Sequence, residues 1–375
     1  MSLKLNIEQV KIRQLKMRMK SPFKTSFGSV QDKQFLILEA RDRDGLTGYG
    51  EGVAFEVPWY TEETMKTSWH VLEDFLLPLI MGKEIHHPDM VSEIFSSIRR
   101  NNMAKATLET AIWDLYAKKQ SIPLATALGG QREKVAVGVS IGIQPTHQQL
   151  YQKIEDALEA GYQRIKVKIK PGEDIALLNA IRNEYPDVPL MADANSCYTL
   201  NDLALLQELD QYGLLMIEQP LGANDIVQHA KLQSQLKTPI CLDESITSYE
   251  DAEAAIDLGS CKVMNIKYAR VGGLTEAKRI HDLCAKHEME VWCGGMLEAG
   301  IGRAHAIALS TLANFTLPGD TAGSTHYWKE DIITPEITVK NGYISISKEP
   351  GIGYEINHSA IERYTVKEKV YRANR

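Results

Sequence analysis

The sequence predicts an α/β protein in which a modified (β/α)8 barrel follows an N-terminal α+β domain. The main observation is a repeat of short β-branched runs and helical stretches. Four consecutive runs end at Lys168, Asp193, Glu218 and Asp243, each 25 residues after the last. One strand and one helix per repeat is typical of a parallel sheet. A second observation is the composition, since 44% apolar and 24% charged residues are ordinary for a folded globular chain.

Residues 1–130 are expected to form the α+β domain. Residues 4–20 and 33–41 alternate or run apolar, as strands do, and the glycine-rich segment 48–52 is expected to end this sheet. The clearest helix is predicted over 102–119, because apolar residues recur there at spacings of three and four.

Residues 131–320 are expected to form the barrel. Its first seven strands would be the runs VAVGVS, RIKVK, PLMAD, LLMIE, PICLD, KVMNIK and MEVWC, which end at 140, 168, 193, 218, 243, 267 and 293. A weaker eighth strand near 314–317 would close the barrel. The alternative is a doubly wound open sheet, but such a sheet usually has a glycine-rich fingerprint after its first strand, and VSIGIQPTH matches that poorly.

The C-terminal segment, 321–375, is too short for a domain. It has strand signals in ITVKNGYISIS, with Asn341-Gly342 as a hairpin turn. We expect it to return to the N-terminal domain or to close the base of the barrel.

Composition and charge exclude several classes of protein. The formal net charge of −7 argues against a nucleic-acid partner, whose usual footprint is a basic patch. No apolar run approaches the roughly 18–20 residues that span a bilayer, and no signal peptide is recognisable, so no membrane partner is expected. The five cysteines form no CxxC pair, which favours reduced thiols in the cytoplasm over disulfides or structural zinc.

Acidic residues end three adjacent strands, at the edge where a barrel has its active site. The carboxylates of Asp193, Glu218 and Asp243 are therefore expected to converge. Three hard oxygen ligands suit Mg²⁺ or Mn²⁺, and their combined charge would be unstable without a cation. For Asn195 and Glu244 two interpretations stay open, a role beside the metal or substrate and an ordinary polar loop residue.

Lysines flank this acidic cluster. Lys168 on the second strand and Lys267 on the sixth are expected on opposite sides of the barrel mouth, and Lys166 faces the same way as Lys168. A second ammonium and a nearby divalent cation both lower a lysine pKa, which would make Lys168 a base near neutral pH. The reaction that fits is removal of a proton α to a carboxylate, because a metal stabilises the enediolate charge.

The strand-end motifs together resemble the enolase superfamily, in its muconate-lactonizing subgroup. They are Lys166-x-Lys168, Asp193-x-Asn195, Glu218-Gln219-Pro220, Asp243-Glu244-Ser245 and Lys267. The resemblance covers nearly the whole chain. Within the subgroup, GGMLEAGIGR at 294–303 and PGDTAGSTHYWKEDI at 318–332 resemble the o-succinylbenzoate synthase and N-succinylamino acid (N-acylamino acid) racemase family.

That resemblance implies a role for each charged residue. The three strand-end carboxylates would bind Mg²⁺, Lys168 would be the base, and Lys166 would tune it. In racemisation Lys267 would be the second acid or base. In the synthase reaction, a dehydration in menaquinone biosynthesis, one lysine would act as base and then as acid, and Lys267 would serve mainly as a cation.

The resemblance also implies that the N-terminal domain caps the barrel mouth with two loops, around 21–28 and 53–60. The aromatic residues of these loops would form either an apolar wall for the substrate or part of the cap core: Phe23, Phe55, Trp59 and Tyr60. Further substrate neighbours would be Ser140, Met296 and Leu297. The expected partner is a small carboxylate substrate, and a homo-oligomer is expected.

Several rival functions are weighed against this one. A dipeptide epimerase of the same subgroup typically has Asp-x-Asp at the eighth strand, whereas LPGDTAGS has Asp320 alone. A muconate-type cycloisomerase is a further alternative, and a sugar-acid dehydratase would replace Lys267 with a His–Asp pair. A Schiff-base aldolase could use a barrel lysine but needs no carboxylate triad, and a non-catalytic barrel has no reason to hold two opposed lysines around one.

Overall fold

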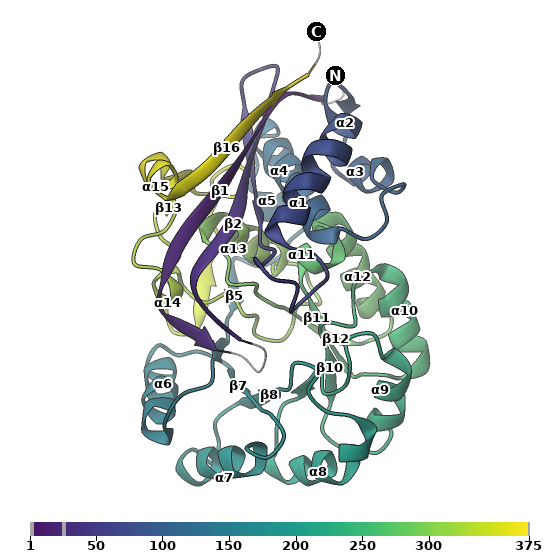
Figure 1. Cartoon of the computed structure of the whole chain (residues 1–375), viewed down its shortest axis with the longest axis vertical. Coiled ribbons are helices and arrows are strands. Elements are labelled where there is room, and N and C mark those ends of the chain that lie inside the picture. Colours follow the sequence, from purple (N-terminus) through teal and green to yellow (C-terminus); the bar gives the residue numbers. More distant parts are fainter. Residues whose placement is uncertain (1–3, 25–27, 374–375) are drawn as a thin grey trace.

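The computed structural model of the chain describes residues 4–24 and 28–373. An antiparallel sheet with helices packed on it lies above a barrel of parallel strands (Figure 1). The C-terminal strand, drawn in yellow, runs beside the purple N-terminal strand. The first and the last described strands therefore both belong to the upper part, which we call the cap.

The cap sheet has the order β16-β1-β2-β3, and all neighbouring strands run antiparallel. Its strands are β1 (Leu5–Lys24), β2 (Ser29–Asp42), β3 (Thr47–Gly52) and β16 (Thr365–Arg372), with the short β4 (Glu84–Ile85) paired to the start of β1. Buried residues tend to alternate along β1, as in a strand with one face on the core. Both strands predicted for this domain are confirmed, and both are longer than predicted.

The glycine-rich segment 48–52, expected to end this sheet, forms most of its edge strand β3, after which the cap helices begin. Helix α4 (Asn102–Lys119), which has the predicted bounds, crosses these glycines closely. A Cβ atom on Gly50 would lie 2.0 Å from the Thr107 carbonyl oxygen. Glycine is therefore used here for close packing of a strand against a helix. The remaining cap helices are α1 (Met65–Val71), α2 (Leu77–Ile80), α3 (Asp89–Ile94) and α5 (Leu124–Leu128), with a π-helical turn (Leu72–Leu76) between α1 and α2.

Seven parallel strands form the barrel wall, in sequence order, as predicted. They are β6 (Val139–Ile141), β7 (Ile165–Lys168), β8 (Leu190–Asp193), β9 (Ile217–Glu218), β10 (Ile240–Leu242), β11 (Val263–Ile266) and β12 (Glu290–Cys293). The helices that follow them are α6 (His147–Glu159), α7 (Asp174–Glu184), α8 (Leu203–Glu208), α9 (Ile226–Gln233), α10 (Tyr249–Leu258), the short α11 (Tyr268–Val271), α12 (Leu274–Lys286) and α13 (Gly300–Leu309). Two 3₁₀ turns, Leu200–Asp202 and Leu209–Tyr212, flank α8.

The eighth strand predicted near 314–317 is not formed, although those residues are all described. Residues 317–320 close the barrel instead with two backbone hydrogen bonds on each side, to β12 and to residues 136–138. Asp320 N donates to Cys293 O over 2.9 Å, and Gly138 N donates to Gly319 O over 2.8 Å. Pro318 has no N–H group, which interrupts the ladder that a regular strand would need.

The C-terminal segment closes the base of the barrel and then returns to the cap. Strand β14 (Tyr343–Ser345) pairs with β5 (Lys134–Ala136) below the barrel, and the turn at Asn341 and Gly342 has the positive φ angles of 50° and 75° that such a turn requires. The other elements here are α14 (Ser324–Tyr327), β13 (Ile333–Thr334), β15 (Glu355–Ile356) and α15 (His358–Tyr364). Strand β16 then pairs with β1.

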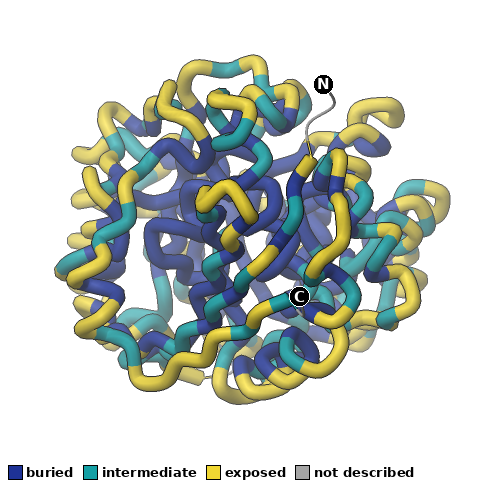
Figure 2. The backbone as a smooth tube through the Cα atoms, turned by 90° about the horizontal axis from the view of Figure 1, so that it is seen from above, coloured by how far each residue is buried: buried dark blue, intermediate teal, exposed yellow. Residues whose placement is uncertain are grey.

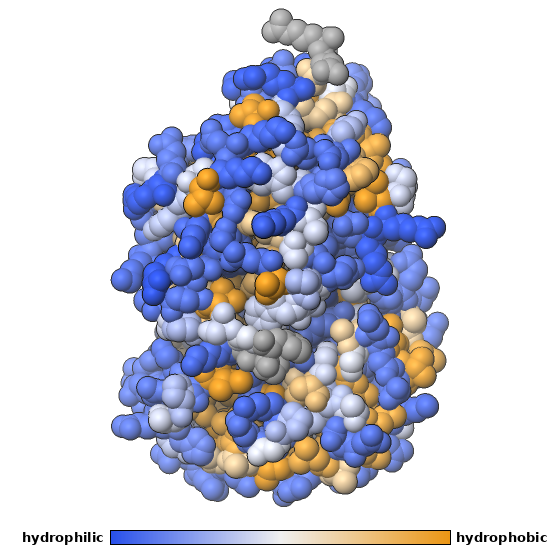
Figure 3. All heavy atoms as spheres, in the orientation of Figure 1, coloured by the Kyte–Doolittle hydropathy of each residue, from blue (hydrophilic) through white to orange (hydrophobic). Residues whose placement is uncertain are grey.

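The burial pattern places the core between the strands and their covering helices. In Figure 2 buried segments lie at the centre and exposed segments at the rim. The face in Figure 3 is mostly hydrophilic, with smaller apolar patches between. Within residues 4–24 and 28–373, no helix is both long and apolar enough to cross a membrane.

Candidate active site

The carboxyl ends of the barrel strands bring charged side chains into one cavity beneath the cap. Lys168, Asp193 and Glu218 are neighbours in the register of β7, β8 and β9. Asp243 directly follows β10, and Lys267 directly follows β11. All of these side chains are buried. The cavity is lined by residues of both domains: Phe23, Phe55, Trp59, Tyr60, Ser140, Lys166, Lys168, Asp193, Asn195, Asp243, Lys267, Gly295, Met296, Leu297, Asp320 and Tyr327.

One side of the cavity is built around Lys168. Its ammonium donates to Asp193 Oδ2 over 2.6 Å and to Asn195 Oδ1 over 2.8 Å. Asn195 in turn donates to Glu244 Oε1 over 3.1 Å. Burial would raise the pKa of the Asp193 carboxyl, but the Lys168 and Lys166 ammoniums outweigh burial and lower it to about 2. Asp193 is therefore ionised at neutral pH.

A further cluster is built around Lys166, which lines the cavity, and Glu218, which lies buried behind it. Lys166 Nζ lies 3.0 Å from Glu218 Oε2 and 2.7 Å from Asp320 Oδ2. Burial opposes the charge on this ammonium, but Asp320, Glu218 and Asp193 outweigh burial and raise the pKa of Lys166 above its usual value. Asn265 donates to the other Glu218 oxygen over 2.8 Å.

The opposite side of the cavity is built around Asp243. Lys267 Nζ donates to Asp243 Oδ2 over 2.8 Å and to the Tyr60 hydroxyl over 2.9 Å, and Tyr60 donates to Asp243 Oδ1 over 3.0 Å. Arg270, one helical turn after Lys267, also pairs with Asp243. Burial opposes the charge on Lys267, but Tyr60, Glu218 and Glu244 outweigh burial and raise its pKa. A cap residue thus touches both a barrel lysine and a barrel carboxylate.

The acidic set suits a hard divalent cation in its chemistry, because all of its ligand atoms are carboxylate oxygens. Asp193 and Asp243 face the same cavity, and Glu218 lies between them on the intervening strand. Glu244 Oε2 is buried without a hydrogen-bond partner among the described residues, so carboxylate oxygen is left over. Burial, with Asp193 and Glu218 nearby, raises the pKa of Glu244 to about 7. In the described ranges each carboxylate points to an ammonium or guanidinium, and no three acidic, histidine or cysteine side chains close around one ion.

The structure also places the predicted substrate neighbours. Phe55, Met296 and Leu297 line the cavity, and Glu244 lies behind Asn195 rather than in the lining. Phe23 lines the cavity from the end of β1, not from a loop as expected, because β1 continues to Lys24 and pairs there with β2.

Asp320 belongs to a buried polar network that was not predicted from the sequence. Its carboxylate accepts from Arg164 Nη2 over 2.5 Å and from Ser140 Oγ over 2.9 Å, and it pairs with Lys166. These contacts lower the pKa of Asp320 despite its burial. Arg164 is two residues before Lys166 and so lies on the same face of the strand. This spacing is the signal that could have predicted Arg164 as a member of the network. Tyr60 and Arg270 at Asp243 were likewise not predicted as polar partners.

Comparisons with known proteins agree with this architecture. A family profile described as the mandelate racemase/muconate lactonizing enzyme N-terminal domain matches residues 7–129, and one described as enolase C-terminal domain-like matches residues 149–360. The chain is similar to an o-succinylbenzoate synthase of Geobacillus kaustophilus, with 60% identity over 98% of each chain. It is 45% identical to an N-succinylamino acid racemase of Thermus thermophilus over 96% of this chain and 98% of that one.

A solved structure has the same fold. An enolase superfamily member from Listeria innocua superposes with a TM-score of 0.95 and 44% identity, over 99% of this chain and 100% of that one.

Proposed function

The chain belongs to the mandelate racemase/muconate lactonizing enzyme family of the enolase superfamily, and on that premise we propose that it is an o-succinylbenzoate synthase. The observation that carries the proposal is one buried cavity in which Lys168 and Lys267 flank a row of strand-end carboxylates. A lysine on each side of a substrate carbon is suited to proton transfer at that carbon. The 60% identity to a synthase over nearly the whole chain supports the substrate assignment.

In the proposed reaction Lys168 removes the proton α to the substrate carboxylate. The C–H electron pair first moves onto the substrate carboxylate as an enediolate, and it then forms the new ring double bond as the adjacent ring C–O bond breaks. Lys168 returns its proton to the departing hydroxide, which leaves as water, so that the cyclohexadiene becomes the aromatic ring of o-succinylbenzoate. Lys267, already paired with Asp243, places a positive charge near the negative charge that develops. This dehydration would serve menaquinone biosynthesis.

Asp193, Glu218 and Asp243 are proposed to hold Mg²⁺ or Mn²⁺, since hard oxygen ligands from three adjacent strands suit either ion. The bound ion would neutralise part of the negative charge that forms on the substrate carboxylate. The Lys166 ammonium, between Asp193 and Glu218, would keep those carboxylates oriented and tune Lys168. Asn195 would hold the Lys168 ammonium in line with the substrate.

A second activity, racemisation of N-succinyl or other N-acyl amino acids, is favoured by the position of Lys267. In that reaction Lys168 takes the α proton from one face and Lys267 delivers a proton to the other. The aromatic wall of Phe23, Phe55 and Trp59 would accept either a succinylbenzoate ring or an apolar side chain. Apolar pockets discriminate by only about 1–3 kcal/mol per methylene, so one site can serve both substrates.

A dipeptide epimerase or a muconate-type cycloisomerase is less well supported. A dipeptide needs a free acidic group for its α-ammonium, and the Asp320 carboxylate is occupied by Arg164, Lys166 and Ser140. A cytoplasmic homo-oligomer remains our proposal for the protein's setting, and five free cysteines are consistent with a reducing compartment.

Parallel kinetics on purified protein test this function. The cyclohexadiene precursor of o-succinylbenzoate, N-succinyl-phenylalanine and L-Ala-D/L-Glu would be assayed with Mg²⁺ and with EDTA. We expect synthase turnover that EDTA abolishes, with slower or comparable racemisation of the N-succinyl amino acid. Epimerisation of the dipeptide with kcat/KM well above both, and no o-succinylbenzoate formed, would overturn the assignment.

A further inference from the structure

A buried lysine of the cap reaches the loop that follows the last regular barrel strand. Lys33 on β2 is only 1% exposed. Its ammonium donates to Met296 O and to Leu297 O, each over 2.7 Å. It also lies 5.8 Å from the centre of the Phe55 ring, over its face. One side chain of the cap therefore touches three residues that line the substrate cavity.

The loop needs such a partner because its backbone is buried and irregular. Leu297 has a φ of 58°, a left-handed conformation that residues with a Cβ adopt at a cost. Buried carbonyl groups outside helices and strands must find donors elsewhere. Lys33 supplies donors for Met296 and Leu297, and Arg303 Nη2 supplies the next carbonyl, Glu298 O, over 2.6 Å. Each of three consecutive carbonyls is thus held by a side chain.

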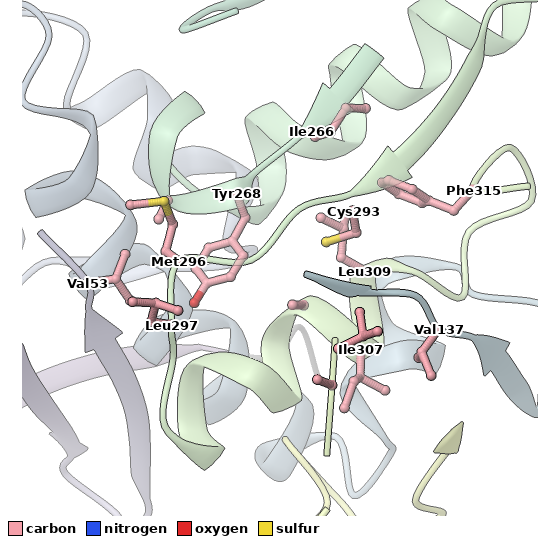
Figure 4. Close-up of a cluster of buried hydrophobic side chains, with 14 of the residues drawn as sticks. Val53, Val137, Ile266, Tyr268, Cys293, Met296, Leu297, Ile307, Leu309 and Phe315 are labelled. Atoms are coloured by element: carbon pink, nitrogen blue, oxygen red, sulfur yellow. The ribbon is translucent and has the colours of Figure 1, made fainter. Parts of the chain in front are cut away.

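Further contacts hold the residues on either side of the loop that Lys33 binds. Glu51 on β3 accepts from Ala299 N over 2.8 Å and from Gly302 N over 2.7 Å, so a second cap residue holds the start of α13. Burial lowers the pKa of Lys33 to about 8, although Glu51 and Glu298 nearby oppose this shift. Figure 4 shows Met296 and Leu297 beside Val53 of the cap and Tyr268 of the barrel.

We propose that Lys33 is a positioning residue for substrate binding, which sets the conformation of residues 296–298 and so the shape of the cavity wall. The proposal rests on the proposed function, because that function defines the substrate whose affinity is measured. Lys33 does not line the cavity. It would therefore act on the substrate only through the loop that it holds. Its loss should weaken binding in ground and transition states alike, which raises KM and leaves kcat.

The test is steady-state kinetics of the synthase reaction in Lys33→Met, which keeps the apolar stem and removes the donors. We expect KM to rise about tenfold, equivalent to about 1.4 kcal/mol, with kcat little changed. Lys33→Gln is shorter by one bond and should reach one carbonyl at most, so its KM should fall between those of Lys33→Met and the wild type. The matched control is Lys118→Met, because Lys118 also donates to a cap carbonyl, Thr47 O over 2.9 Å, but touches no cavity residue among the described residues.

A double-mutant cycle keeps the proposal testable if Lys33→Met does not fold. Leu297→Gly frees the loop at its left-handed residue. If Lys33 acts through the loop, Lys33→Gln should raise KM much less in the Leu297→Gly background than in the wild type. An unchanged KM in a folded Lys33 variant, an equal rise in Lys118→Met, or fully multiplicative effects in the cycle would overturn the proposal. A wild type without synthase turnover would instead refute the proposed function.

Discussion

Tyr60→Phe removes one hydroxyl from the site and tests whether Lys168 and Lys267 have different roles in the two reactions. That hydroxyl accepts from Lys267 Nζ over 2.9 Å and donates to Asp243 Oδ1 over 3.0 Å. After the substitution Asp243 keeps Arg270 as a donor and Lys267 keeps Asp243 as an acceptor. The substitution thus removes one acceptor for the Lys267 and Arg270 side chains and one donor to Asp243. Lys168 and its partners are untouched.

The expected magnitude follows from the type of bond. A hydrogen bond to a charged group contributes about 1.5–3 kcal/mol, which corresponds to a factor of about 10 to 150 in rate. Racemisation needs Lys267 as an acid or base, so its kcat should fall by that factor. Synthase turnover uses Lys168 for both proton transfers, so its kcat should fall by a much smaller factor.

The assay compares both reactions in the same variant. Formation of o-succinylbenzoate is followed beside racemisation of N-succinyl-phenylalanine, with Mg²⁺ saturating. Tyr327→Phe is the matched control, because Tyr327 also lines the cavity but its hydroxyl meets neither lysine in the part of the chain that is described. An equal loss of both activities in Tyr60→Phe would refute the division of labour between the lysines.

Three further predictions concern the metal ligands, the two lysines and the buried Glu109. Asp193→Asn should weaken Mg²⁺ binding, measured by calorimetry, and reduce turnover severely, and full turnover in excess EDTA would show that the carboxylates do not hold an essential ion. Lys168→Ala should abolish both activities whereas Lys267→Ala should abolish only racemisation, which kinetics on the two purified variants would check. Glu109, whose pKa burial raises from 4.5 to about 7, contributes stability that is complete below pH 4.5 and lost as the pH rises through 7. Relative to Glu109→Gln, the wild type should therefore lose about 3 kcal/mol of unfolding free energy between pH 4.5 and pH 8, and a pH-independent difference in urea unfolding would contradict this.

The strand-end residues could be found from the sequence because a local rule connects them. Parallel strands that repeat every 25 residues present their carboxyl ends at one edge of a barrel. Residues such as Lys168, Asp193 and Glu218 then fall side by side without any knowledge of long-range contacts. The 25-residue spacing of the strands also predicted their order in the sheet correctly.

Contacts between the cap and the barrel could not be found in this way. Lys33 and Met296 are 263 residues apart, and nothing in the local pattern of β2 indicates that its lysine is buried. The same holds for Tyr60, whose aromatic ring suggested an apolar wall although its hydroxyl joins Lys267 to Asp243. The eighth strand is absent for a local reason, because Pro318 has no N–H group to donate to a regular strand ladder.

The most direct test of the account is exchange of the α proton with solvent deuterium in the two lysine variants. N-succinyl-D-phenylalanine and N-succinyl-L-phenylalanine would each be incubated in deuterated water with Lys168→Ala and with Lys267→Ala, and exchange would be followed by proton NMR. Lys168 and Lys267 belong to β7 and to the end of β11, with three strands between them. We predict that each variant keeps exchange for at most one enantiomer, and that the surviving enantiomer differs between the two. Equal exchange of both enantiomers in either variant would contradict the two-lysine site.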